Sequence, residues 1–149
     1  MKTMISVIMS VYREPIQDVV ISVESILSQT YQKWEMIIVL DCPKNLEVKK
    51  YLTSLSTSFE NIHFIENKIN LGLGASLNKA ILIAKGKYCA RMDAEDRSLP
   101  DRLEKQISHF NKNNETDLLF CQWKEIYLDG SEKKREPSST DVKNIRKNR

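Results

Sequence analysis

The sequence predicts an α/β fold built on a mainly parallel sheet with helices on both faces. Short apolar runs rich in Ile and Val alternate with segments whose apolar residues recur every three or four positions. Three consecutive strand–helix units of this kind imply crossover connections, which make neighbouring strands parallel. A length of 149 residues, with 41% hydrophobic and 29% charged residues, suits one globular domain.

The first two units follow directly from the N-terminus. Residues 4–11 form a short apolar run typical of a buried strand. Pro15 suits the first turn of a helix, and residues 16–27 carry one apolar face at helical spacing. A second strand is expected at 34–40, followed by a second helix whose apolar face covers residues 48–59.

The next two units repeat the pattern. A short strand at 62–65 precedes a helix at 77–84, which Gly86 ends. A fourth strand at 88–92 leads to a further helix, and Asp101 lies near the positive end of that helix.

The C-terminal part is less regular. Late strands are expected at 118–123 and 125–128, followed by the turn signal Asp129-Gly130. Beyond residue 131 the periodicity is lost and basic residues accumulate. We therefore expect a domain over residues 1–131 and a basic tail or linker over residues 132–149.

Several classes of protein are disfavoured. The longest apolar runs have five residues, whereas a membrane span needs about 20. Residues 1–9 resemble a short signal peptide, but Tyr12, Arg13 and Glu14 follow at once without a small-residue cleavage site, so a buried strand is the better interpretation. The basic tail lacks interleaved aromatic residues, which argues against a nucleic-acid partner and leaves open a weak association with the inner membrane surface.

The cysteines and histidines give no metal or disulfide pattern. Cys42, Cys89 and Cys121 are widely spaced and odd in number, so we expect buried thiols in a reducing, cytoplasmic compartment. His63 and His109 lie far apart in the sequence, and nothing pairs them as ligands.

Polar and acidic side chains follow the predicted strands, at the edge of the sheet where ligands bind in such folds. They are Tyr12 and Glu14 after the first strand, Asp41 after the second, and Asp93, Glu95 and Asp96 after the fourth. Clustered carboxylates repel one another unless a cation compensates, and Mg²⁺ or Mn²⁺ suits both carboxylates and substrate phosphates. The last three therefore predict a metal–diphosphate site, with helix capping and solvation as the alternative.

The glycines Gly72 and Gly74 open the third helix. Leu77 and the position of the loop rule out the dinucleotide-binding G-x-G-x-x-G pattern, and no Walker A motif is present. Either a tight turn or a close approach of the backbone to a ligand explains these glycines. Similarly, Tyr12 could stack on a base or pack under the first helix, and Asn78 could turn toward the strand ends.

Taken together, these stretches resemble family 2 glycosyltransferases of the Rossmann-like GT-A fold. The resemblance covers nearly all of residues 4–110 and is strongest to bacterial enzymes that build surface polysaccharides. It is carried by residues 6–12 with Glu14, residues 25–31 leading to 38–41, residues 70–73 with Asn78, and residues 90–96 leading to 99–103.

The resemblance implies roles for individual residues. The donor-binding set would be Ser10, Tyr12, Glu14, Asp41, Gly72, Asn78 and Asp93. Tyr12 would stack on the base, and Asp41 would contact the base or ribose. Glu95 would take the metal-ligand position of the D-x-D motif, with Asp93 and Asp96 beside it, and Mn²⁺ or Mg²⁺ would neutralise the leaving nucleoside diphosphate.

The sequence also departs from the family pattern. The acidic pair after the second strand reads Leu40-Asp41, and Glu95 is one methylene longer than the usual Asp. No residue matches the family's general base on the acceptor side. We therefore expect the donor-binding half of an inverting, metal-dependent glycosyltransferase, as a fragment that is incomplete for transfer.

Its partners would be a nucleotide-diphospho-sugar and a glycan or lipid-linked acceptor. A non-catalytic nucleotide-sugar-binding module or gene remnant is the alternative. A signalling receiver domain is disfavoured, because the third strand ends in Glu66-Asn67-Lys68 instead of a phosphoacceptor Asp.

Overall fold

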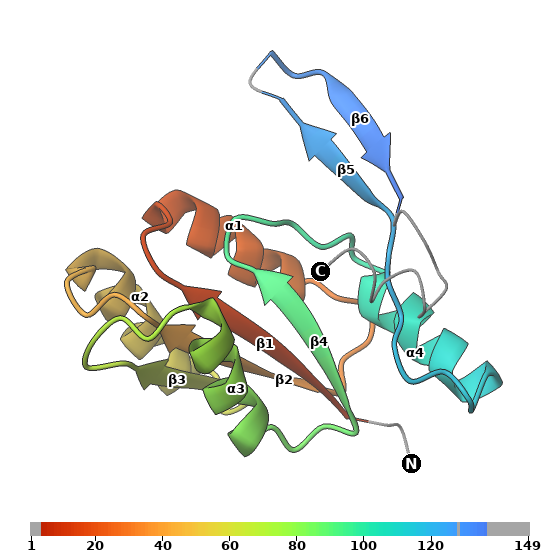
Figure 1. Cartoon of the computed structure of the whole chain (residues 1–149), viewed down its shortest axis with the longest axis horizontal. Helices are drawn as coiled ribbons and strands as arrows, with labels where there is room; N and C mark the ends of the chain where they lie inside the picture. The colour runs from red at the N-terminus through yellow and green to blue at the C-terminus, as the bar shows by residue number, and fades with distance from the viewer. Residues whose placement is uncertain (1–3, 128, 137–149) are drawn as a thin grey trace. The chain divides into compact units, whose positions relative to one another are not determined.

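Four strands form one parallel sheet, as the alternating pattern predicts. The computed structural model describes residues 4–127 and 129–136. The strands are β1 (Ile5–Val11), β2 (Trp34–Leu40), β3 (Ile62–Glu66) and β4 (Tyr88–Asp93). Their order is β3-β2-β1-β4, and every neighbouring pair is parallel (Figure 1). The chain therefore moves outward from β1 to β3 and then returns to the other side of β1.

Helices cover both faces of this sheet. They are α1 (Ile16–Leu27), α2 (Leu46–Ser58) and α3 (Leu73–Ile83). A further helix, α4 (Arg102–Lys112), follows β4 in the chain. Figure 1 shows α1 and α2 on one face and α3 on the other. Side chains alternate across a strand, so Val7 and Met9 join the large core beneath α1 and α2, whereas Ile8 joins a small core with Ala80 of α3. The predicted fold class is confirmed.

Short local signals fix the helix starts. The Asn45 side chain accepts a hydrogen bond from the Val48 amide and caps α2. Pro15 stands just before α1, and α4 begins directly after Asp101. Helix α3 begins at Leu73, between the two glycines expected to open it, and Gly72 adopts a φ of 84° at its N-cap. Left-handed backbone of this kind favours glycine.

A buried carboxylate ties strands together at the amino ends of the sheet. Glu35 is 4% exposed, and it accepts hydrogen bonds of 2.6 Å from the Ser6 hydroxyl and from the Lys85 amide. Its other oxygen lies 3.3 Å from His63 Nε2. Burial alone would raise the pKa of the Glu35 carboxyl, but these donors hold it below its ordinary value.

Gly86 lies against the same group of residues. Its amide donates to Ser6 Oγ at 2.8 Å. A Cβ at Gly86 would lie 2.5 Å from the Ser6 backbone nitrogen, which is closer than real Cβ contacts allow. The absence of a side chain therefore lets the segment before β4 approach β1.

The chain divides into two units at residues 108 and 109, and the second contains a separate hairpin. Strands β5 (Trp123–Ile126) and β6 (Glu132–Arg135) pair antiparallel around the predicted turn at Asp129-Gly130. Ion pairs join Lys124 to Glu132 and Arg135 to Glu125 across the strands.

The predicted late strands are therefore wrong in position. Residues 118–122 are irregular, and β5 spans the junction between the two expected strands. Residues 132–135 form β6, although a tail was expected from residue 132. The remainder of that expected tail, residues 137–149, lies outside the described residues, and the domain boundary after residue 131 stays a prediction.

The structure also bears on membrane-spanning helices and on the cysteine thiols. None of the helices within residues 4–127 and 129–136 is long and apolar enough to cross a membrane. The expectation of buried thiols is wrong for Cys89 and Cys121, which are exposed. Cys89 lies on β4, and Cys121 lies in the irregular segment before β5.

Candidate functional site

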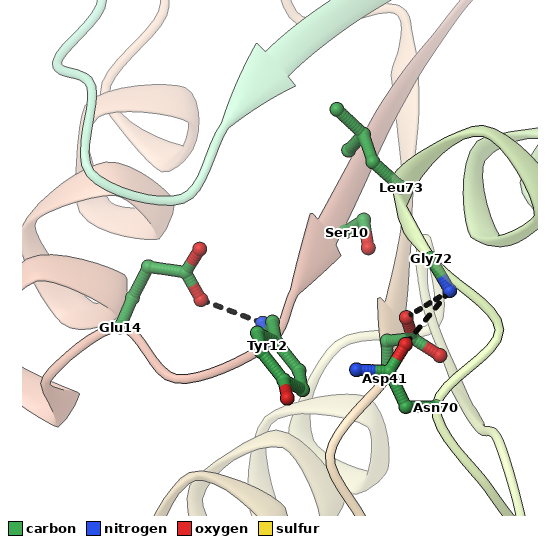
Figure 2. A pocket seen from close by; sticks show the side chains of 7 residues that line it. All are labelled: Ser10, Tyr12, Glu14, Asp41, Asn70, Gly72 and Leu73. Atoms are coloured by element: carbon green, nitrogen blue, oxygen red, sulfur yellow. Dashed lines mark hydrogen bonds between the residues drawn. The ribbon is translucent and has the colours of Figure 1, made fainter.

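A pocket lies at the carboxyl ends of β1 and β2. Its volume is about 310 Å³. The end of β1 and the following turn, the end of β2, and the loop before α3 all contribute to it (Figure 2). The lining residues are Ser10, Tyr12, Glu14, Asp41, Asn70, Gly72 and Leu73. Segments far apart in the sequence thus meet at the edge of the sheet where ligands bind in α/β folds.

The turn after β1 is held by its own carboxylate. Glu14 Oε2 accepts a 2.6 Å hydrogen bond from the Tyr12 backbone amide, and Figure 2 shows the Glu14 side chain pointing toward that amide. The Arg13 guanidinium lies 4.8 Å from the centre of the Tyr12 ring, a cation–π distance. Glu14 therefore orients Tyr12, which presents a half-exposed aromatic ring at the pocket.

The floor of the pocket contains a buried acid. Asp41 is 2% exposed, and its two oxygens accept 2.8 Å hydrogen bonds from the backbone amides of Leu71 and Gly72. Burial alone would raise the pKa of the Asp41 carboxyl, but the donors from Leu71, Asn67 and Gly72 hold it below its ordinary value. The ionised carboxylate also lies at the positive end of α3, which favours a negative charge.

The acidic segment begins one strand away. Asp93 ends β4 and is the Cα partner of Ser10 on β1. The Arg91 guanidinium pairs with the Asp93 carboxylate at 2.9 Å. The pKa of Asp96 is raised, first by partial desolvation of its carboxyl and then by the negative charge of Asp93. These two acids therefore repel each other in part, despite Arg91.

The acidic side chains after β4 do not by themselves form a complete set of metal ligands. Within residues 4–127 and 129–136, no three His, Cys, Asp or Glu side chains are grouped so as to hold a metal ion. Mg²⁺ in nucleotide-binding enzymes commonly takes one or two carboxylates and completes its shell with phosphates and water. The mutual repulsion of Asp93 and Asp96 fits a cation of that kind, so the donor set is compatible with a divalent metal bound together with a diphosphate.

The structure brings together five of the seven residues expected to bind the donor. Ser10, Tyr12, Glu14, Asp41 and Gly72 all line the pocket. Asn78 is exposed on α3 and Asp93 ends β4; neither lines the pocket, and Glu95 and Asp96 are exposed after β4. The binding roles of all these residues stay predictions.

Sequence reasoning missed part of the site. Asn70 and Leu73 belong to the stretch 70–73 that carries the family resemblance, but neither was expected to bind the donor, yet both line the pocket. Asn67, which donates to Asp41, was also missed. A single buried amide has no periodic or motif signal, because its role depends on partners that only the tertiary structure supplies.

A match to a protein-family model shows which family the chain belongs to. The model described as "Glycosyl transferase family 2" matches residues 6–149. The chain belongs to glycosyl transferase family 2. The resemblance drawn from the sequence is thereby confirmed.

Relatives of this family 2 chain come from several organisms. The uncharacterized glycosyltransferase MJ1057 of Methanocaldococcus jannaschii is 45% identical over 119 residues, covering 80% of this chain and 41% of that protein. The O-antigen biosynthesis glycosyltransferase WbnJ of Escherichia coli is 39% identical over 111 residues, covering 74% and 43%. The chain thus spans about two-fifths of the length of these relatives.

Solved structures share the fold. S. aureus TarS 1–349 in complex with UDP-GlcNAc superposes with a TM-score of 0.67 at 18% identity, covering 74% of this chain and 32% of TarS 1–349. The mannosyltransferase PcManGT from Pyrobaculum calidifontis, in complex with GDP-Man and Mn²⁺, gives 0.64 at 19% identity, covering 71% and 32%. The family 2 chain therefore has the GT-A-like α/β fold predicted from its sequence.

Proposed function

We propose that this chain binds a nucleotide-diphospho-sugar in the pocket at the ends of β1 and β2, as the donor-binding part of a metal-dependent, inverting glycosyltransferase. One observation carries the proposal: in a family 2 chain, five residues expected to bind the donor converge on one pocket of about 310 Å³. Two solved structures with this fold are complexes, one with UDP-GlcNAc and the other with GDP-Man, which supports a donor of this class.

The pocket residues suit the nucleoside part of such a donor. The Tyr12 ring offers a face for base stacking, which is commonly worth about 1–3 kcal/mol per base. Each carboxylate oxygen can accept about two hydrogen bonds. Asp41 Oδ2 accepts one from Gly72 in the structure, which leaves it capacity for a donor group on the base or ribose.

The diphosphate would extend from this pocket toward the end of β4. Asp93, Glu95 and Asp96 are the residues that would hold Mn²⁺ or Mg²⁺ there. When bound, the metal would supply charge neutralisation for the leaving nucleoside diphosphate. Arg91 pairs with Asp93 in the structure, so its guanidinium also lies close enough to meet a phosphate group that approaches this carboxylate.

The acceptor side is the second half of the proposal. An acceptor hydroxyl on a glycan or lipid-linked saccharide would attack the anomeric carbon in line, and the nucleoside diphosphate would leave with inversion. Such a reaction would take place in the cytoplasm or at the inner membrane surface. The general base that accepts the hydroxyl proton has no assigned residue.

Titration calorimetry tests the donor-binding step. The chain is titrated with UDP and with GDP, in Mn²⁺ and again in EDTA. We expect one of the two nucleotides to bind, more tightly with Mn²⁺, and Tyr12→Ala to weaken that binding. Failure of both nucleotides to bind in either condition would overturn the proposal. Incubation with nucleotide sugars, with released diphosphate and glycoside product measured separately, then tests transfer.

A further inference from the structure

A buried polar network lies behind the pocket and centres on Asn67, the residue after β3. Asn67 and Ser76 have no exposed surface. The Asn67 amide nitrogen donates to Asp41 Oδ1 at 2.7 Å and to Ser76 Oγ at 2.9 Å. Its oxygen accepts from Lys79 Nζ at 2.7 Å. Both amide hydrogens are therefore used, and the side chain links β3 to α3 and to the end of β2.

The Lys79 contact fixes which way the amide faces. A lysine ammonium only donates hydrogen bonds, so the oxygen of the Asn67 amide must face Lys79. The NH₂ group is then the side that faces the Asp41 carboxylate, which only accepts. If the Asn67 amide were flipped, its NH₂ group would face the Lys79 ammonium and its oxygen would face the Asp41 carboxylate. Two donors and two acceptors would then oppose each other inside the protein.

The contact with Asp41 reaches the pocket through two backbone amides. Asp41 Oδ1 accepts from both Asn67 and Leu71, and Oδ2 accepts from Gly72. The carboxylate therefore holds two consecutive amides of the loop that lines the pocket, and Asn67 is the side chain that donates to the same carboxylate from behind the pocket. Asn67 itself does not line the pocket.

We propose that Asn67 is a positioning residue for the donor site: by orienting Asp41, it fixes the loop at Leu71 and Gly72 and directs the remaining acceptor capacity of Asp41 into the pocket. This inference rests on the proposed function, because it concerns affinity for the same nucleotide. It adds a residue that touches neither the donor nor the metal.

The main test compares Asn67→Ala with the matched variant Asn61→Ala. Asn61 is a partly buried asparagine whose amide donates to the Trp34 carbonyl, at the opposite end of the sheet. Asn61→Ala removes one amide hydrogen bond to a backbone carbonyl, whereas Asn67→Ala removes the three hydrogen bonds of the network. We expect Asn67→Ala to weaken binding of UDP or GDP by about tenfold or more, and Asn61→Ala to leave the affinity unchanged even if it unfolds more easily.

Hydrogen exchange of the backbone provides a readout without ligand. The Leu71 and Gly72 amides should exchange faster in Asn67→Ala than in the wild type, because their acceptor is no longer oriented. Should Asn67→Ala fail to fold, Lys79→Met is the milder variant, since Lys79 is only partly buried. It should give the same exchange signature with a smaller loss of affinity.

A third variant adds a pH profile. Asn67→Asp keeps the shape of the side chain, but it can donate to Asp41 only while the two carboxyls share a proton. Its affinity should therefore be lower at about pH 8 than at about pH 5, relative to the wild type at each pH.

The outcomes separate the two proposals. Wild-type binding together with unchanged affinity and unchanged Leu71 and Gly72 exchange in Asn67→Ala overturns the role of Asn67 alone. A wild-type chain that binds neither nucleotide overturns the proposed function, and the role of Asn67 in binding with it. Reduced affinity in Asn67→Ala, with Asn61→Ala unaffected, supports both.

Discussion

Ser10 and Asp93 lie opposite one another as Cα partners on the parallel strands β1 and β4. Ser10 lines the pocket, and Asp93 begins the acidic segment. Neighbouring strands lie about 4.8 Å apart, so a nucleotide in the pocket has to extend across only one strand to reach Asp93. The base site and the acidic segment are therefore adjacent through the register of two strands.

The first prediction concerns the coupling of metal and nucleotide. Asp93→Asn should abolish most of the gain in UDP or GDP affinity that Mn²⁺ provides, because it removes the carboxylate of the acidic segment whose backbone pairs with the pocket residue Ser10. Calorimetry with Mn²⁺ and with EDTA measures that gain. Asp101→Asn is the matched control, since Asp101 pairs with Lys105 on the surface. An undiminished Mn²⁺ effect in Asp93→Asn would refute the assignment.

The second prediction concerns base stacking. Tyr12→Ala should weaken nucleotide binding by about 1–3 kcal/mol, whereas Tyr12→Phe should retain most of the affinity because the ring remains. Calorimetry provides the affinities, and thermal unfolding provides the control. Tyr12 is only partly buried. Normal binding by Tyr12→Ala, combined with a lower melting temperature, would assign Tyr12 to the core instead.

The third prediction concerns the close approach at Gly86. Gly86→Ala should lower the free energy of unfolding by about 1–3 kcal/mol, because the new Cβ would overlap the Ser6 backbone. Urea denaturation measures the change. Gly74→Ala is the matched control: Gly74 lies in α3 with nothing within 4 Å of an added Cβ, and alanine there should stabilise by up to about 1 kcal/mol. Equal stability of the two variants would contradict the steric account.

The fourth prediction concerns the pH dependence of stability. The folded-state pKa of Glu35 lies below its ordinary value, so the ionised carboxylate stabilises the fold above an unfolded pKa of about 4.3. This stabilisation is lost as the pH falls through the folded pKa. Glu35→Gln should therefore cost about 2 kcal/mol at neutral pH, and the difference from the wild type should shrink in acid.

Denaturation at a series of pH values measures this difference. The exposed Glu60, in the turn before β3, supplies the control variant Glu60→Gln, which should follow the wild type throughout. A deficit in Glu35→Gln that stays constant down to low pH would show that shape, not charge, is responsible.

The parallel sheet could be predicted because its strands bury both faces. Continuous apolar runs and helical spacing placed β2 at 34–40 as observed, and placed β1, β3 and β4 within one residue at each end. The hairpin of β5 and β6 could not be placed in this way. Its strand at Glu132–Arg135 contains only charged residues and is held by cross-strand ion pairs, so hydrophobic periodicity gives no signal for it.

The pocket was predictable to the extent that its residues follow strands directly. Tyr12 and Asp41 come immediately after buried strands, and the carboxyl ends of parallel strands meet at one edge. Asn78 was placed with them because the family resemblance implies a donor-binding role, but it is exposed on α3 and does not line the pocket. Asn67 escaped prediction because a buried amide network exists only once three separate segments have packed.

The backbone conformation of Gly72 restricts which amino acids can replace it beside the pocket. Nothing lies within 4 Å of an added Cβ there, so space does not exclude a side chain; the φ of 84° does. A positive φ is unfavourable for an L-amino acid, but for its mirror image it belongs to the ordinary extended region. D-alanine introduced at Gly72 by chemical ligation should therefore be accepted where L-alanine is not. This position thus offers a place to attach a reporter group beside the pocket, provided that the group is carried on an amino acid of opposite chirality.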